Sequence, residues 1–213
     1  IDLSALEVVD SYVYIYQNSS LETLDMSSLQ EVGYYFKVAY HDYLEPIALD
    51  SLETVSGDFY VYQNDAWTDM ELPVLDEVSG AFRISDHNST GVETIYAPSL
   101  SYVGDNVYID WNYKLESIDL SSLTEVNGQV YMYYNTGLEE VDLSSLEEVN
   151  SSVNISYANN METLEMDSLT EISGSMTINN NSSLETFSAT LLESLGSNLY
   201  IQDNTNLTSV DLT

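Results

Sequence analysis

The amino-acid sequence repeats itself every 23 residues from one end to the other. The segment Leu115–Gly137 reads LESIDLSSLTEVNGQVYMYYNTG, and the next repeat begins again at Leu138 with LEEVDLSSLEEVN. A fixed period of this length is typical of a solenoid, in which each repeat packs on the one before it. The first apolar residues of the repeats are Leu21, Leu44, Trp67, Val92, Leu115, Leu138, Met161, Leu184 and Leu207. Two extra residues lie between Trp67 and Val92, and Asn-Ser-Thr-Gly predicts a loop near His87 to Gly91.

Each repeat contains two short segments in which apolar and polar residues alternate. Val13-Tyr-Ile15 and Leu24-Asp-Met26 are examples, and their period of two predicts short strands with one buried face. Because equivalent apolar residues recur in every repeat, equivalent strands are expected to pair side by side in parallel sheets. The sequence therefore predicts an all-β fold, a parallel β-solenoid of about nine 23-residue coils forming one domain over residues 1–213. Since the chain begins and ends within a repeat, we expect it to be a fragment or processed part of a longer chain.

A column rich in asparagine follows the strand that begins at Val13. Its members are Asn18, His41, Asn64, His87, Asn112, Asn135, Ala158, Asn181 and Asn204. Asparagine tolerates tight turns, and its amide can hydrogen-bond the backbone of a neighbouring coil. The column predicts a ladder that satisfies the polar groups of the turns. The two histidines are interpreted as replacements for ladder asparagines, not as metal ligands or catalytic groups.

The charge of the chain is strongly unbalanced and excludes several partners. There are 36 acidic residues against 3 Lys and Arg, which gives a formal net charge of −33. Such a surface repels phosphate backbones and anionic lipids, so we expect no nucleic-acid partner. No apolar run is long enough for a membrane span, so membrane insertion is not expected either. The acidity also indicates screening by salt or calcium, as in a halophilic or calcium-rich setting.

One motif resembles a known family. Its apolar and asparagine positions are Val130, Met132, Asn135, Leu138, Val141, Leu143 and Leu146, preceded by Leu123, Val126 and Gly128. This spacing resembles a leucine-rich repeat, with Asn-x-x-Leu in place of the usual Asn-x-Leu, and it is closer to receptor L-domains. The resemblance covers essentially the whole chain. It implies a right-handed all-β solenoid used for binding at a cell surface.

Tyrosines gather at positions that should point outward from the strands that begin at Val13 and its equivalents. Side chains alternate across a strand, so residues between the buried ones face solvent. The predicted ligand-binding face comprises Tyr12, Tyr14, Tyr16, Tyr35, Tyr60, Tyr62, Tyr108, Trp111, Tyr131, Tyr133 and Tyr200. Two interpretations are compatible. The rings have high β-propensity and stack between coils, and they also suit recognition of protein or carbohydrate.

The second predicted sheet is acidic on its outer side. Like charges one strand spacing apart repel by about 0.9 kcal/mol even in water, so ions should screen or bridge them. The face is interpreted either as a solubilising surface or as a set of weak calcium sites, because oxygen ligands suit calcium. Candidate calcium ligands are Asp25, Glu71, Asp119, Asp142 and Glu165. No other cofactor is expected.

These features predict a non-enzymatic protein located outside the cell or on its surface. We expect an adhesion or recognition module that binds a cell-surface protein or glycan through the tyrosine-rich sheet. A structural subunit that stacks head to tail into an extracellular filament or surface layer is the alternative, because open strand edges recruit further strands. A polysaccharide-active β-helix enzyme is a third class, although no Ser-His-Asp arrangement or phosphate-binding glycine loop stands out in the sequence.

Overall fold

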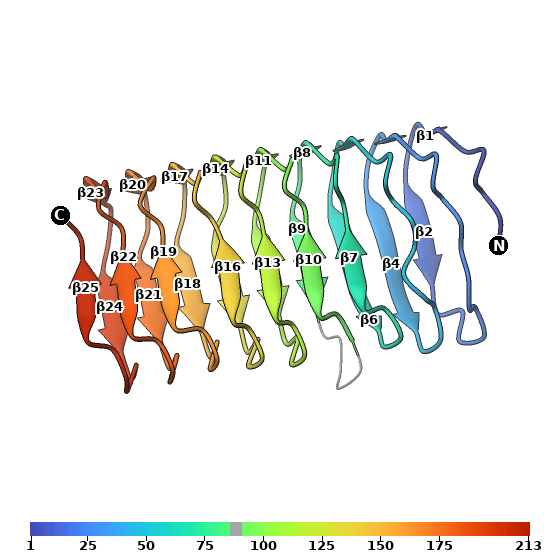
Figure 1. Ribbon diagram of the computed structural model, residues 1–213. Coiled ribbons are helices and arrows are strands. Elements are labelled where there is room, and N and C mark those ends of the chain that lie inside the picture. The colour runs from blue at the N-terminus through green and yellow to red at the C-terminus, as the bar shows by residue number, and fades with distance from the viewer. Residues whose placement is uncertain (86–90) are drawn as a thin grey trace.

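Each repeat forms one coil of a parallel β-solenoid of about nine coils. The computed structural model describes residues 1–85 and 91–213, and within these ranges it contains strands and turns but no helix (Figure 1). No described segment is therefore a helix of the length and apolar character that a membrane crossing needs. The predicted loop from His87 lies outside the described residues apart from Gly91, as does the expected ladder position of His87 itself.

Three rows of strands enclose the core, and a coil contributes at most one strand to each row. The first row is a nine-stranded sheet, here called the tyrosine sheet. It consists of β2 (Val13–Tyr16), β4 (Phe36–His41), β6 (Phe59–Asn64), β9 (Phe82–Ser85), β12 (Val107–Asp110), β15 (Val130–Tyr133), β18 (Val153–Ser156), β21 (Met176–Asn179) and β24 (Leu199–Gln202). All of its neighbours pair in parallel, and residues one coil apart lie opposite one another, as Val107 and Val130 do.

The second row, here called the narrow sheet, has nine strands of two residues each. These are β1 (Val8–Val9), β3 (Glu31–Val32), β5 (Thr54–Val55), β8 (Glu77–Val78), β11 (Tyr102–Val103), β14 (Glu125–Val126), β17 (Glu148–Val149), β20 (Glu171–Ile172) and β23 (Ser194–Leu195). Sequence analysis predicts only two strands in each coil, so it misses this sheet. Two residues are too few to show an alternating pattern, and the signal is only the buried valine column that ends each strand.

The third row, here called the acidic row, lies across the core from the tyrosine sheet (Figure 1). It is divided into two sheets. One contains β7 (Asp69–Glu71), β10 (Thr94–Tyr96), β13 (Ser117–Asp119) and β16 (Glu140–Asp142), and the other contains β19 (Thr163–Glu165), β22 (Thr186–Ser188) and β25 (Ser209–Asp211).

The predicted strand at Leu24-Asp-Met26 does not form in the first coils. There the structure has only an isolated bridge between Asp2 and Asp25. Pro46 occupies the next coil at the position equivalent to Asp69, which begins β7. Proline has no N–H to donate to a strand ladder, and this explains why regular pairing starts one coil later.

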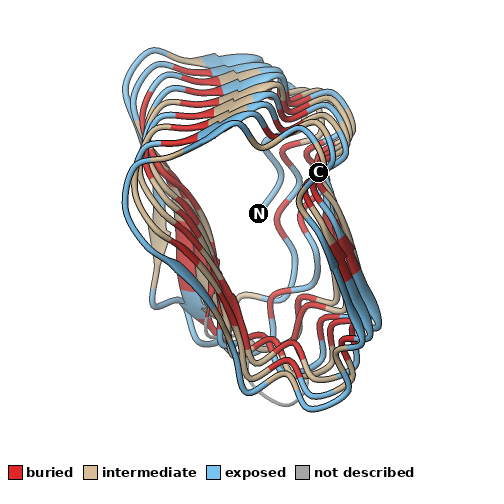
Figure 2. Ribbon diagram, turned by 90° about the vertical axis from the view of Figure 1, so that its left-hand side faces the viewer, coloured by how far each residue is buried: buried red, intermediate tan, exposed pale blue. Residues whose placement is uncertain are grey.

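The interior is a continuous apolar column. Figure 2, which looks toward the end of the solenoid, shows that buried residues recur at the same places in successive coils and form bands along the walls. Phenylalanines stack along part of the core, with ring centroids 5.1 Å apart for Phe36 and Phe59 and 5.3 Å apart for Phe59 and Phe82. The leucine columns of the sequence, such as Leu100, Leu123 and Leu146, are fully buried. Each coil thus covers the apolar surface of the next.

The predicted asparagine ladder forms along the end of the tyrosine sheet, and it joins consecutive coils. The side-chain amide of Asn135 donates to the carbonyl of Ile109 at 2.7 Å, and its Oδ1 accepts the backbone N–H of Asn112 at 3.1 Å. Asn112 in turn donates to the carbonyl of Ile84 at 3.0 Å. Asn64, Asn181 and Asn204 donate to the equivalent carbonyls of the preceding coils. Buried turn groups therefore find partners in the next coil.

The residue just before each ladder position has a left-handed backbone. In the described residues these are Gln17, Tyr40, Gln63, Trp111, Tyr134, Tyr157, Asn180 and Asp203, with φ between 52° and 64°. A residue other than glycine in this region costs roughly 1–3 kcal/mol unless its surroundings hold it there. Here the ladder holds the next residue, and the strand bonds continue through the left-handed one, since the N–H of Tyr134 donates to Ser156 at 3.1 Å.

We expect Asn135→Ala to destabilise the protein strongly. The change leaves the Asn112 N–H and the Ile109 carbonyl without the side-chain partner, at a cost of roughly 1–3 kcal/mol for each buried group. Urea unfolding followed by circular dichroism measures the loss. Asn206→Ala is the matched control, because Asn206 is exposed in a turn and does not belong to the ladder, and a surface change of this kind usually costs less than about 0.5 kcal/mol. Equal losses in the two variants would contradict the role given to the ladder.

His41 should make the stability depend on pH in the weakly acidic range. Its ring is fully buried between Asn18 and Asn64, with Nδ1 3.1 Å from Asn64 Oδ1, and burial lowers the pKa of His41 from its ordinary value of 6.5. The unfolded chain then binds the proton more readily, so stability is complete above pH 6.5 and falls as the pH drops toward the folded-state pKa. Relative to wild type, His41→Asn should gain stability below that pH in urea titrations. Parallel curves for the two proteins would show that His41 has no such effect.

Candidate functional site

The predicted aromatic residues lie on the outer side of the tyrosine sheet, as the alternation requires. None of the eleven is buried, and the most exposed are Tyr12 at 53%, Tyr14 at 49% and Tyr200 at 46%. Their inner neighbours, such as Val13 and Ile109, belong to the core. We call the outward side chains of the tyrosine sheet, with the rings at its two margins, the tyrosine face.

The first group of rings on the tyrosine face surrounds Lys37. Tyr12 and Tyr35 stack at the start of β2 and β4 with centroids 4.9 Å apart, and Tyr14 and Tyr16 stack at 5.4 Å along β2. The Lys37 ammonium lies over three rings, 5.5 Å from the centroids of Tyr14 and Tyr16 and 5.1 Å from that of Tyr62. A hydrogen bond with Tyr62 is the main reason why the pKa of Lys37 is raised. Lys37 is therefore positively charged at neutral pH.

The second group of rings follows the left-handed column. Trp111 and Tyr134 stack face to face with centroids 4.5 Å apart, and Tyr134 and Tyr157 stack at 4.3 Å. Tyr133 meets these rings edge to face. Trp111 belongs to the face predicted from the sequence, whereas Tyr40, Tyr134 and Tyr157 do not. Their shared position directly before the ladder column is the signal that could have found them.

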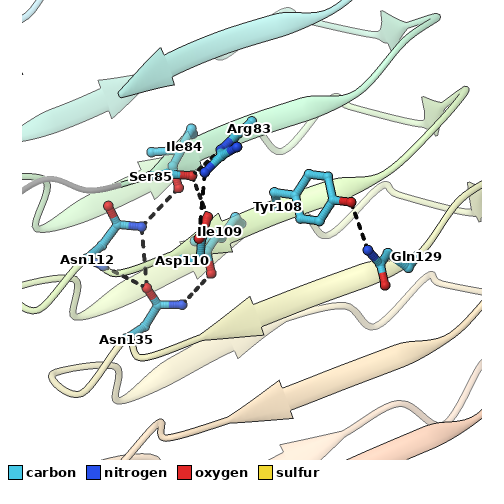
Figure 3. Close-up of polar contacts among 9 residues, drawn as sticks. All are labelled: Arg83, Ile84, Ser85, Tyr108, Ile109, Asp110, Asn112, Gln129 and Asn135. Carbon is cyan, nitrogen blue, oxygen red and sulfur yellow. Dashed lines mark hydrogen bonds and ion pairs between the residues drawn. The ribbon is translucent and has the colours of Figure 1, made fainter. Parts of the chain in front are cut away.

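A polar network separates the two groups of rings. Figure 3 shows Arg83 on β9 turned toward Ser85 and Asp110, beside the ladder residues Asn112 and Asn135. The Arg83 Nε donates to the Ser85 hydroxyl at 2.7 Å, Nη2 lies 3.8 Å from the Asp110 carboxylate, and Ser85 donates to Asp110. The guanidinium also lies 5.8 Å from the Tyr108 ring centroid. Sequence analysis overlooks this network because its members come from two coils.

The structure does not bring all of the predicted residues together. Tyr200 on β24 lies three strands beyond Tyr131 on β15, and Asn154 and Thr177 occupy the same outward row between them. The aromatic part of the face therefore extends from β2 to β15 with the rings beside it, and Tyr200 is separate.

Tyr60 on β6 lies between Lys37 of the first group of rings and Arg83 of the polar network. It pairs in register with Lys37 on one side and with Arg83 on the other. Burial, together with the nearby Asp58 carboxylate, raises the pKa of Tyr60 to about 12. Its hydroxyl is thus protonated at physiological pH and donates a hydrogen bond to the Asp58 carboxylate.

The acidic row presents carboxylates that have a structural role. Asp25, Asp119 and Asp142 each accept the backbone N–H of the residue two positions later, at 3.0, 3.0 and 2.9 Å. These are Asx turns, which form the corner after the strand position. The recurring Asp-x-Ser of the sequence is their signal. Glu71 and Glu165, the other candidate calcium ligands, are exposed on β7 and β19.

The described part of the chain contains no group of three His, Cys, Asp or Glu side chains placed to hold a metal ion. The carboxylates are spread along the solenoid instead. One set of them, here called the Glu column, comprises Glu22, Glu45, Glu93, Glu116, Glu139, Glu162 and Glu185. Backbone bonds join its members from coil to coil, since the N–H of Glu139 donates to the carbonyl of Glu116 at 2.9 Å. The calcium sites expected from the sequence remain a prediction.

Comparison of the chain with protein-family models, with curated proteins and with solved structures gives no match. The assignment of a function therefore depends on the geometry of the two faces.

Removing one carboxylate from the Glu column should stabilise the protein at low salt. Glu139→Gln relieves repulsion from its neighbours, and about 1 kcal/mol in total corresponds to a rise in Tm of about 2–4 °C for a domain of this size. Thermal melts in dilute buffer measure the effect. In about 1 M sodium chloride, where charges are screened within about 3 Å, wild type and variant should melt together. Calcium chloride at matched ionic strength tests for bridging ions, which would stabilise wild type more than sodium chloride does.

Proposed function

We propose that this protein is an extracellular or cell-surface recognition module that binds a protein or carbohydrate partner through the tyrosine face. The observation that carries the proposal is the composition of that face. At the outward second and fourth positions of its nine strands there are eight tyrosines, two positive residues and a single carboxylate, Asp110. The chain as a whole carries −33, so one wall of the solenoid differs sharply from the rest.

Aromatic side chains of this kind suit recognition because they offer a large contact area, a hydroxyl group and few rotatable bonds. Here the rings are already held in place by stacking and edge contacts with one another. Binding of a partner would therefore cost little side-chain entropy, because the rings are already ordered before it binds. Extended exposed aromatic surface on a soluble protein generally marks an interaction site.

The repeat spacing supports the same function. We infer kinship with receptor L-domains from the recurring apolar and asparagine positions, and such domains serve in binding at cell surfaces. The solenoid fold with coils about 23 residues apart is consistent with this kinship. The carboxylates of the acidic row would keep the opposite side hydrated, so that binding is confined to one wall.

A variant with Tyr14, Tyr60, Tyr108 and Tyr131 changed to Ser should lose binding to glycans and to cells. These four residues share one outward row across the tyrosine sheet, and their loss removes most of its ring area. A glycan array and a cell-binding assay measure the change. Each truncated aromatic contact in an interface centre typically costs at least about 1–2 kcal/mol, so we expect a loss of binding of roughly a hundredfold or more.

The matched control changes Tyr43 and Tyr96 to Ser. Both are exposed, at 64% and 40%, but neither belongs to the tyrosine sheet, since Tyr96 ends β10 of the acidic row. The control should bind as wild type does. Full binding by the fourfold variant, with an unchanged circular dichroism spectrum, would exclude the tyrosine face as the recognition surface.

A further inference from the structure

Two of the three positive side chains in the protein flank one tyrosine. Lys37 lies on β4 and Arg83 on β9, and the strand between them, β6, carries Tyr60 in register with both. Two strand spacings separate the two backbones, about 9–10 Å. The third positive residue, Lys114, is exposed in a turn outside the tyrosine sheet. The positive side chains of the tyrosine sheet are therefore confined to the stretch from β4 to β9.

The same stretch is a hollow in the surface. Its volume is about 330 Å³, and it is lined by Lys37, Tyr40, Tyr60, Tyr62 and Arg83. Pockets for small ligands generally begin at about 300 Å³. The hollow is therefore of a size to hold one small chemical group, whereas a broad protein interface would not fit into it. Three rings and two positive groups form its walls, and no carboxylate is among the described residues that line it.

The positive groups are held in position but retain donors. Lys37 lies among the tyrosine rings, and an ammonium has three N–H donors. Arg83 uses Nε for Ser85 and approaches Asp110 through Nη2, whereas a guanidinium has five N–H donors in a planar fork. Its side chain is 39% exposed. Such a fork matches the two oxygens of a carboxylate or sulfate.

The electrostatics of the wall favour an anion. Lys37, Arg83 and Asp110 are the charged residues at the outward strand positions described above, which gives that set a net charge of +1 in a chain of −33. At physiological ionic strength the repulsion from exposed carboxylates is screened beyond about 8 Å. Two nearby carboxylates, Asp58 beside Tyr60 and Asp110 beside Arg83, are already engaged in hydrogen bonds. An anionic group seated between Lys37 and Arg83 meets both positive charges, and Asp110 offsets part of the charge of Arg83.

We propose that the hollow between Lys37 and Arg83 binds the acid group of an anionic saccharide, a carboxylate or a sulfate, while the sugar ring lies against Tyr60 and Tyr62. This inference rests on the proposed function and specifies the class of partner. Aromatic rings contact the apolar face of a sugar, and the two positive side chains select for the acid group. A neutral saccharide would make only the first kind of contact.

Isothermal titration calorimetry with defined oligosaccharides tests the proposal. The probes are a tetragalacturonate, which carries carboxylates, a sulfated heparin tetrasaccharide, and a neutral cellotetraose. Wild type should bind at least one of the two acidic probes at least about tenfold more tightly than cellotetraose, because a hydrogen bond to a charged group contributes at least a factor of that size. The acidic probe that binds more tightly identifies the acid group.

Three variants locate the site. Lys37→Gln and Arg83→Gln should each weaken binding of the preferred acidic probe by about tenfold or more, and Lys37→Arg should restore most of it by keeping the charge. Lys114→Gln is the matched control, because it changes the net charge of the protein by the same amount. It should bind the acidic probe as wild type does. Thermal melts of each variant verify that the fold is retained.

Several results would overturn the inference. Equal affinity for acidic and neutral probes, failure of both acidic probes to bind, or equal weakening by Lys114→Gln would each exclude an anion site at Lys37 and Arg83. If cellotetraose or a protein partner still binds and the fourfold tyrosine variant loses that binding, the recognition function stands without the anion site. Self-association that Lys37→Gln and Arg83→Gln both abolish, measured by analytical ultracentrifugation, together with failure of the acidic probes to bind, would assign the positive pair to contacts between copies of the chain.

Discussion

The fold depends on one constraint, the parallel pairing of each coil with the next in an unshifted register. A strand shifted by one residue would turn its apolar side chains outward, so the pairing of Val107 with Val130 must be held firmly. The asparagine ladder serves this purpose, because Asn135 bonds both the Ile109 carbonyl and the Asn112 N–H of the preceding coil. A shift of one residue would break both hydrogen bonds. The left-handed residues before the ladder are tolerated for the same reason. Four of them, Tyr40, Trp111, Tyr134 and Tyr157, carry rings that extend the tyrosine face.

Much of this architecture is predictable from the sequence, because a repeat supplies many copies of the same observation. The columns of leucine and valine predict the core, the alternation around Tyr131 predicts the tyrosine sheet, and the asparagine column predicts the ladder. Each coil repeats these signals, so a single irregular residue such as Ala158 does not obscure them.

The parts that the sequence does not predict are those without periodicity or with partners in another coil. The narrow sheet has strands too short for alternation, and Pro46 prevents regular pairing in a segment whose apolar pattern is intact. Arg83 and Asp110 lie 27 positions apart in the sequence, because the longer repeat has 25 residues and Asp110 follows Tyr108, the register partner of Arg83, by two positions. The site therefore emerges only when the coils are stacked. The kind of partner that the face can bind depends on single residues such as Lys37, which do not recur at the equivalent position of other repeats.

Parallel stacking also has a consequence for how such a surface can change over evolutionary time. The strands of the tyrosine face lie side by side in the order in which their coils follow one another in the chain. Neighbouring positions on the face are therefore encoded by neighbouring repeats of the gene. Duplication or deletion of one 23-residue unit between Lys37 and Arg83 would alter their separation by about 4.8 Å while leaving a complete core on either side. Spacing between binding groups can thus vary in discrete steps, independently of the residues that maintain the fold.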